Sequence, residues 1–195
     1  MGQVVAALSM SLDGFVADEN DGVAELFGWY QNGNVEIRSA DPRWTFHVTE
    51  ASARFLRPAL SLCGALICGR RLFDETDGWG GRHPAGCPVF VVSHDVPHGW
   101  PREDSATTFY PDPMAALEAA QAQAGDLTVA VSTPTLTRQY LDAGLLDEIR
   151  VSLVPVLLGE GVSLFGGLTV APVRLADPDV IVGRGVTHLT YRVRR

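Results

Sequence analysis

Gly69, Arg70 and Arg71 are the residues whose types and spacing most directly suggest chemistry. They follow the apolar run GALIC at 64–68 and open a predicted short helix that ends at Thr76. A helix N-terminus presents free N–H groups and a positive dipole end, and arginine adds charge and bidentate hydrogen bonds. The segment therefore suits the phosphate of a dinucleotide; the alternative is two exposed arginines at a helix start.

Polar side chains also follow two other apolar runs. They are Ser93 and His94, after PVFVV at 88–92, and Ser132, Thr133, Pro134 and Thr135, after LTVAV at 127–131. In open α/β sheets, ligands gather outside the carboxyl ends of the strands, where hydroxyl groups can bond phosphate oxygens. The alternatives are an ordinary turn at the first segment and a helix cap at the second.

Asp13 lies in SLDGF, just beyond the apolar run QVVAALS at 3–9. A carboxyl group there could donate a proton or accept a hydrogen bond from a substrate. The alternative is an Asp-Gly turn residue with no further role.

Several kinds of site are not indicated by the sequence. There is no GxGxxG fingerprint and no GxSxG elbow, and the chain has no lysine for a Schiff base. The five histidines are scattered singly with no HExxH motif or cysteine cluster, so no metal site is expected.

Composition narrows the class of protein. With 46% hydrophobic and 19% charged residues, the 195-residue chain can bury a real core. The net charge of −8 argues against nucleic acid or an anionic membrane as partner, although local arginines can still hold a phosphate. Three cysteines without a tight motif predict buried free thiols in a reducing cytoplasm, and no signal peptide or membrane span is recognised.

Apolar periodicity predicts strands alternating with helices. The predicted strands are 3–9, 64–68, 88–93, 107–110, 127–131 and 147–158, the last bent at Pro155, followed by a hairpin of 170–175 and 186–194; the predicted helices are 49–60, 70–76, 113–124 and 133 or 135 to 143. Residues 23–46 are expected to be irregular, because Gly28, Gly33 and Pro42 interrupt them. The pattern predicts an α/β fold, mostly parallel, with helices on both faces and an antiparallel C-terminal hairpin, in one domain over 1–195.

Four segments resemble one known family. They are AALSMSLDGFVA at 6–17, ALICGRRLFDE at 65–75, PVFVVSH at 88–94 and QYLDAGLLDEIRVSLVPVLLGEGVSLF at 139–165. Together they resemble the RibD C-terminal domain-like group of the dihydrofolate reductase superfamily. The resemblance implies a three-layer αβα dihydrofolate reductase-like fold, usually a homodimer. It also implies an NADPH-dependent reductase acting on a small carbonyl, imine or heterocycle.

The resemblance also implies roles for particular residues. The cofactor would contact Ala7, Gly69, Arg70, Arg71, Leu72, Ser93, His94, Ser132, Thr133, Pro134 and Thr135. The loop that carries Asp13, Gly14 and Phe15 would cover the nicotinamide. The substrate would lie beside it, near Phe15, Trp44, Pro155, Leu158 and Gly159.

The chain departs from this family at two positions. Ser132 and Thr133 stand where relatives usually carry a glycine pair that lets backbone approach the cofactor, and Leu72 stands where threonine is usual. A β-branched Thr133 could crowd a pyrophosphate, or its hydroxyl could bond it. The alternative function is a repurposed scaffold that binds a small molecule without NADPH, in a cleft lined by Phe15, Trp29, Trp44 or Trp79. A purely structural or interaction protein is a third alternative.

Overall fold

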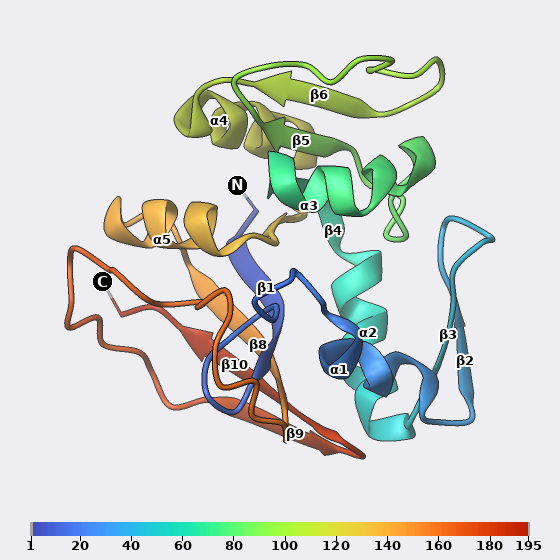
Figure 1. Ribbon diagram of the computed structural model, residues 1–195, viewed down its shortest axis with the longest axis vertical. Helices are drawn as coiled ribbons and strands as arrows, with labels where there is room; N and C mark the ends of the chain where they lie inside the picture. Colours follow the sequence, from blue (N-terminus) through green and yellow to red (C-terminus); the bar gives the residue numbers. More distant parts are fainter. Residues whose placement is uncertain (1, 195) are drawn as a thin grey trace.

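An eight-stranded sheet forms the centre of the molecule (Figure 1). The computed structural model describes residues 2–194. The strands are β1 (Val4–Ser11), β4 (Cys63–Gly69), β5 (Val89–Val92), β6 (Thr107–Tyr110), β7 (Thr128–Val131), β8 (Glu148–Val154), β9 (Asp179–Gly183) and β10 (Val186–Arg192). Their order is β6-β5-β4-β7-β1-β8-β10-β9, parallel from β6 to β8, with β10 antiparallel to both β8 and β9.

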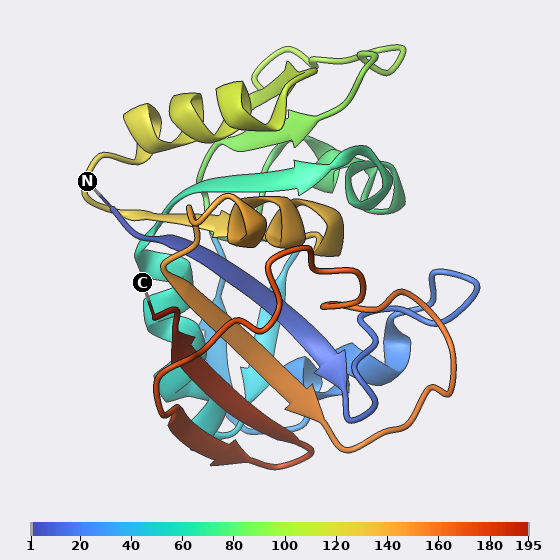
Figure 2. The same cartoon turned by 90° about the vertical axis from the view of Figure 1, so that its left-hand side faces the viewer.

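Helices cover both faces of this sheet, which gives three layers (Figures 1 and 2). The helices are α1 (Ala24–Phe27), α2 (Glu50–Ser61), α3 (Arg70–Glu75), α4 (Pro113–Ala124) and α5 (Pro134–Asp142), with 3-10 turns η1 (Gly28–Gln31) and η2 (Asp77–Gly81). A separate two-stranded sheet joins β2 (Val35–Arg38) to β3 (Thr45–Val48). Helices α4 and α5 share one core, and α2 and α3 pack in cores that do not include them.

Successive side chains along each strand point to opposite faces of the sheet, so both faces need a layer of helices. In β4, Ala65 and Ile67 join the core under α4 and α5, whereas Leu66 and Cys68 join the core around Phe73 of α3. An uninterrupted apolar run of this kind therefore leaves both faces to be covered. The predicted fold class, α/β with a mostly parallel sheet and an antiparallel C-terminal hairpin, is confirmed.

Local sequence signals fix the starts of two helices as predicted. Thr49 caps α2, accepting a hydrogen bond from the backbone N–H of Ser52. Asp112 caps α4 by accepting from two backbone N–H groups, and Pro113 occupies the first turn, where its missing N–H costs nothing.

The prediction that residues 23–46 are irregular is wrong. This segment contains α1, η1, β2, the turn after β2 and the first residues of β3. These short elements bury Leu26, Trp29 and Ile37 in the core that α2 shares with Phe46. Packing against α2 stabilises these short elements. The sequence pattern did not indicate them, because Gly28, Gly33 and Pro42 interrupt the segment.

The C-terminal predictions need two further corrections. Residues 170–175 do not form a strand; Leu175 makes only an isolated bridge to Val193, and the first strand of the hairpin is β9. Pro172 within that segment cannot donate to a ladder. For the same reason β8 ends at Val154, immediately before Pro155, rather than continuing to residue 158.

The described residues contain no helix with both the length and the apolar character needed to cross a membrane. The exposed edge strand β9 carries Val180 and Val182 at 52% and 72% exposure. The homodimer inferred from the resemblance stays a prediction.

A buried polar network ties α2 to the sheet through His188 of β10. Its Nδ1 lies 3.0 Å from Ser152 Oγ and its Nε2 lies 3.0 Å from Ser52 Oγ, while the ring stacks on Phe55 with centroids 4.2 Å apart. The side chain is fully buried. Burial lowers the pKa of His188 to about 4, so the imidazole stays neutral in the folded state.

This network predicts a loss of stability in mild acid. In the unfolded chain a histidine titrates near a pKa of about 6.5, so stability is fully present above that pH and falls as pH drops toward 4. Between pH 7 and pH 5, protonation of His188 in the unfolded chain should lower the unfolding free energy by about 2 kcal/mol. Urea unfolding of His188→Gln should show a correspondingly smaller loss over this range. The control is His98→Gln at an exposed site; equal pH dependence of the two variants would contradict the assignment.

Candidate functional site

The predicted ligand-binding segments meet at one edge of the sheet. Strands β1, β4, β5, β7 and β8 all end on the same side of the molecule (Figure 2). The register places Val131 of β7 opposite Ala6 and Ile67, and Gly69 opposite Val92. Thr133, two residues beyond Val131, therefore lies level with the end of β4. The three polar segments singled out in the sequence therefore follow the ends of neighbouring strands.

Two strands continue beyond this level. β1 and β8 stay paired as far as Ser11 and Val154, whereas β7 has already ended opposite Ala6 (Figure 2). The carboxyl edge consequently has a step: a floor made by the ends of β7, β4 and β5, and a wall made by the extensions of β1 and β8. Ala7 lies at the foot of this wall, and the segment from Pro155 to Gly159 continues its top.

Asp13 holds the top of the wall together. Its Oδ1 accepts hydrogen bonds from Ser11 Oγ at 2.5 Å and from the backbone N–H of Leu158 at 3.2 Å, and its Oδ2 accepts from Gly159 N at 2.7 Å. These hydrogen bonds, chiefly that from Ser11, hold the pKa of the carboxyl below its usual range. Asp13 is therefore an anion at neutral pH, and of its two predicted roles the geometry supports hydrogen-bond acceptor rather than proton donor.

The loop after β1 is joined to the segment after β8 by backbone hydrogen bonds. Val16 N donates to Val162 O, Val162 N donates to Ala17 O, and Leu164 N donates to Gly14 O. Gly161 is required for this approach, since a Cβ there would lie 2.1 Å from Ala17 O. Phe15, a predicted substrate residue, bridges Ser163 in the same arrangement.

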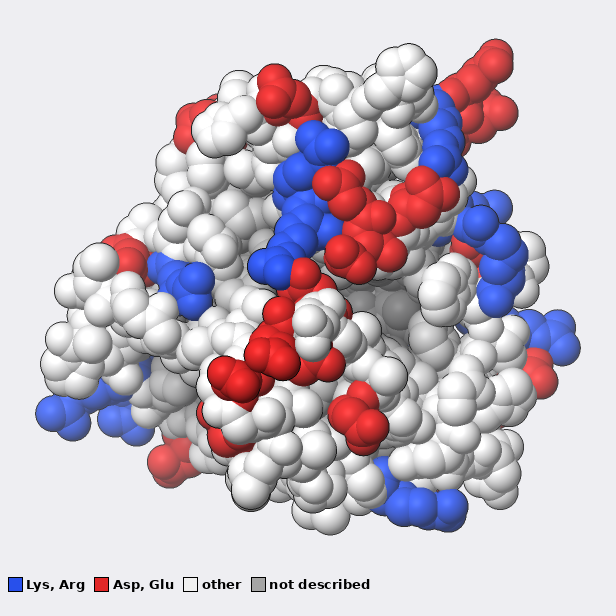
Figure 3. Space-filling view, in the orientation of Figure 1, with Lys and Arg blue, Asp and Glu red and all other residues white. Residues whose placement is uncertain are grey.

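The two arginines of α3 are both paired with carboxylates. Arg70 Nε lies 2.8 Å from both oxygens of Asp74, and its Nη1 donates to Asp95 O at 3.3 Å. Arg71 forms an ion pair with Asp21, which the loop after β1 brings across the edge. Figure 3 shows a stripe of basic side chains flanked by acidic ones on the face turned to the viewer.

Beside Arg70 the surface is hollowed over a volume of about 290 Å³. Ser93, His94 and Asp95 line this hollow with Arg70. Ser93 Oγ donates to Asp95 O at 2.6 Å, which fixes the turn after β5. The hollow therefore brings together Arg70 from one predicted phosphate-binding segment and Ser93 and His94 from another.

Thr133, the cap of α5, is relaxed in the structure but has an unused hydroxyl. Its φ of −131° and ψ of 140° are ordinary for a β-branched residue, so threonine in place of glycine does not strain the turn. Thr133 Oγ1 is buried and has no hydrogen-bond partner, and it makes no capping bond to α5. A Cβ built on Gly69 would lie 3.7 Å from this oxygen.

Three predicted residues lie apart from the strand ends or use their side chains elsewhere. Leu72 packs at the margin of the core around α3. Trp44 is 46% exposed and lies on the turn that joins the two strands of the separate sheet, β2 and β3. Trp29, suggested for an aromatic cleft, is a core residue that stacks on Tyr30.

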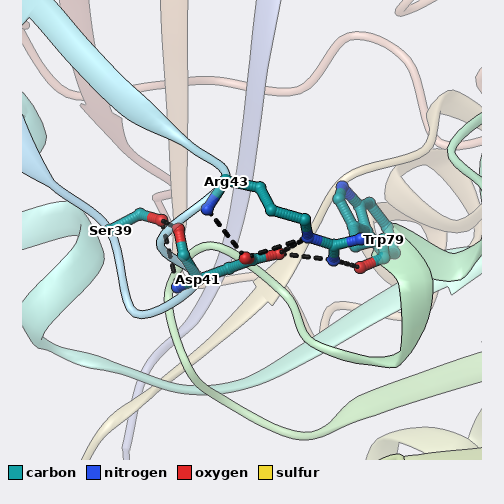
Figure 4. Close-up of polar contacts among 4 residues, drawn as sticks. All are labelled: Ser39, Asp41, Arg43 and Trp79. Atoms are coloured by element: carbon teal, nitrogen blue, oxygen red, sulfur yellow. Dashed lines mark hydrogen bonds and ion pairs between the residues drawn. The ribbon is translucent and has the colours of Figure 1, made fainter.

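An arginine bridge positions the turn that carries Trp44. Arg43 binds both oxygens of the buried Asp41 and donates to the carbonyl oxygen of Trp79 (Figure 4). Ala40 N donates to Pro84 O at 2.8 Å, so the turn is attached at two points to the glycine-rich segment after α3.

Sequence reasoning missed the acidic partners of the α3 arginines. Asp74 stands four residues after Arg70, a helical spacing that could have revealed the pair. Asp21 is separated from Arg71 by 50 positions and gave no such signal. Within residues 2–194, no group of three or more His, Cys, Asp or Glu side chains is arranged to hold a metal ion.

Known structures share this fold over the whole chain. A putative riboflavin biosynthesis protein from Shewanella sp. PV-4 is 25% identical, with a TM-score of 0.71 and 100% of each chain covered. RibD from Acinetobacter baumannii is 16% identical, with a TM-score of 0.65; the match covers 100% of this chain and 58% of that one. Dihydrofolate reductase from Enterococcus faecalis, complexed with NADP(H) and RAB-propyl, is 13% identical, with a TM-score of 0.62 and coverage of 100% and 98%.

A comparison with curated proteins found no match. The sequence profile of the RibD C-terminal domain, in contrast, matches residues 3–181, which is most of the chain. Together with the dihydrofolate reductase-like fold, this match confirms the resemblance noted in the sequence. The chain belongs to the RibD C-terminal domain family.

Proposed function

We propose that the chain is an NADPH-dependent reductase that acts on a small carbonyl, imine or heterocyclic substrate at the step in the carboxyl edge. The observation that carries this proposal is the unpartnered Thr133 hydroxyl at the start of α5, beside Gly69 and near the α3 arginines. A buried hydroxyl without a partner costs about 1–3 kcal/mol, which a phosphate oxygen bonded to it would recover.

The residues at the floor of the step fit a dinucleotide. Gly69 leaves space next to Thr133, and α5 adds the positive end of a nine-residue helix. Arg70 and Ser93 at the hollow would hold phosphate oxygens, with Arg71 adding charge. A phosphate reaches Thr133 Oγ1 only after the side chains that shield it shift, because that oxygen is closed to solvent.

NADPH, when bound, supplies the hydride and its electron pair. The chain itself positions and shields the reacting groups. Asp13 fixes the covering loop against Leu158 and Gly159, and its carboxylate is available to accept a hydrogen bond from a substrate N–H or O–H. Because Asp13 is ionised, the proton that accompanies the hydride comes from solvent or from the substrate.

One observation favours the alternative of a scaffold that binds a small molecule without NADPH. Arg70 and Arg71 already have carboxylate partners, and these would repel a phosphate. Exposed ion pairs contribute only about 0–1 kcal/mol, whereas hydrogen bonds to charged groups contribute about 1.5–3 kcal/mol. A phosphate can therefore displace or share these partners, and we favour the reductase.

Competition between Asp21 and a phosphate predicts opposite effects of two substitutions. Arg71→Ala should weaken NADPH binding about tenfold, the loss of one charge-assisted contact. Asp21→Asn should tighten binding severalfold, because Arg71 is released; asparagine also tolerates the φ of 65° at this position. Calorimetric titration of both variants and the wild type with NADPH measures the dissociation constants.

Arg38→Ala serves as the control, since Arg38 is an exposed arginine paired only locally with Glu36. Unchanged affinity in both Arg71→Ala and Asp21→Asn would remove Arg71 from the site. A wild type that binds neither NADPH nor NADH would instead favour the non-reducing scaffold.

Thr133→Val should move stability and binding in opposite directions. Valine keeps the branched shape and removes the unsatisfied hydroxyl, so the unfolding free energy without nucleotide should rise by about 1 kcal/mol. NADPH affinity should fall about tenfold through loss of a phosphate contact. Urea unfolding and calorimetric titration measure the two effects.

Thr137→Val is the matched control for this substitution. Thr137, one turn further along α5, also has a buried hydroxyl without a partner. It should gain similar stability with unchanged NADPH affinity. If the two valine variants bind NADPH equally well, Thr133 does not contact the cofactor.

A further inference from the structure

Two free cysteines far from the candidate site lie in contact. The Sγ atoms of Cys63 and Cys87 are 3.2 Å apart, although the residues are 24 positions apart in the sequence. Cys63 is the first residue of β4, and Cys87 precedes β5 by two residues. The pair therefore lies at the amino ends of these strands, opposite the edge that carries Gly69.

The strand pairing holds the two sulfur atoms together. β4 and β5 are parallel neighbours, with Leu66 opposite Val89, and Leu66 N donates to Pro88 O at 2.9 Å. A disulfide needs sulfur atoms about 2.05 Å apart, so bond formation requires a movement of only about 1 Å. We expect side-chain rotation to supply this movement, because the pairing of β4 with β5 fixes the backbone beside both cysteines.

The two thiols differ in a way that assigns their roles. Cys63 is partly exposed, whereas Cys87 is buried. The hydrogen bond from Cys87 lowers the pKa of the Cys63 thiol, and the same contact, together with burial, raises the pKa of Cys87. Cys63 is thus the thiol suited to react first with an oxidant, and Cys87 is the thiol suited to react second, with the oxidised Cys63.

His83 lies beside the second thiol. Its Nδ1 is 3.9 Å from Cys87 Sγ and accepts a hydrogen bond from Ala85 N at 3.2 Å, which identifies Nδ1 as the unprotonated nitrogen. Burial lowers the pKa of His83 to about 4, so the ring is neutral at pH 7 and is not a base for the Cys87 thiol.

We propose that Cys63 and Cys87 are a redox-active thiol pair that closes to a disulfide with hydrogen peroxide as oxidant. The Cys63 thiolate attacks one peroxide oxygen, the O–O bond breaks, and a sulfenic acid and hydroxide form. The Cys87 sulfur then attacks the Cys63 sulfur, forming the S–S bond as the S–O bond breaks, and the departing hydroxide takes the Cys87 proton and leaves as water. Two thiols and one peroxide thus yield one disulfide and two waters once the released protons are counted.

The disulfide encloses residues 63–87, a loop that contains α3 and the glycine-rich segment after it. Restricting this loop in the unfolded chain should raise the melting temperature by roughly 5–10 °C. The carboxyl edge should not move, because both sulfur atoms lie at the amino ends of β4 and β5. The oxidised and reduced forms should therefore bind NADPH alike, which separates this inference from the proposed function.

Peroxide treatment of the 195-residue chain tests the pair directly. Maleimide labelling of the denatured product, followed by mass spectrometry, should count one free thiol where the reduced chain has three. Trypsin digestion without reductant should link the peptides 55–70 and 83–102, which carry Cys63 and Cys87. The link should also form in Cys68→Ser, which removes the other cysteine of the first peptide.

Cys63→Ser should keep both remaining thiols and give no link, and its oxidised and reduced samples should melt at the same temperature. Cys68 is fully buried, and burial raises its pKa to about 12, so it should stay reduced in every sample. Three surviving thiols, a link through Cys68, or Cys63 carried on to sulfinic acid without a link would each overturn the proposal.

Discussion

The register of β1 between its two neighbours is the constraint on which the candidate site depends. β7 ends opposite Ala6, whereas β8 stays paired with β1 as far as Ser11. Because strands of unequal length end at different levels, the carboxyl edge acquires a step. Helix α5 begins on the lower level at Pro134, and the turn that contains Asp13 forms on the upper one. A shift of β1 by one residue would also exchange its two faces and remove Val4 and Ala6 from the core under α4 and α5.

The two levels of the step differ in how their polar groups are satisfied. On the wall, the Asp13 carboxylate already accepts three hydrogen bonds, and these lower its pKa because they stabilise the ionised form. On the floor, Thr133 keeps a buried hydroxyl without a partner. Satisfied groups give rigidity, and unsatisfied ones are poised to gain from a ligand. The wall is therefore suited to hold the covering loop and a substrate in position, and the floor is the part suited to binding the phosphate of a cofactor.

Much of this arrangement could be predicted from local sequence. Apolar runs followed by polar segments locate the strand ends, and Thr49 and Asp112 mark helix starts by capping chemistry that acts within three residues. Non-local relations gave no such signal. The short elements around Trp29 form because they pack on α2, and the Arg71–Asp21 and Cys63–Cys87 contacts join residues 50 and 24 positions apart. Such contacts follow from the sheet order, which periodicity alone does not determine.

Amide hydrogen exchange with and without NADPH tests the central claim most directly, since it reports binding and its place together. We expect slower exchange in the first turns of α3 and α5 and in the turn after β5, with β9 and β10 unchanged. Protection elsewhere, or none at saturating NADPH, would contradict a cofactor site at the step in the carboxyl edge.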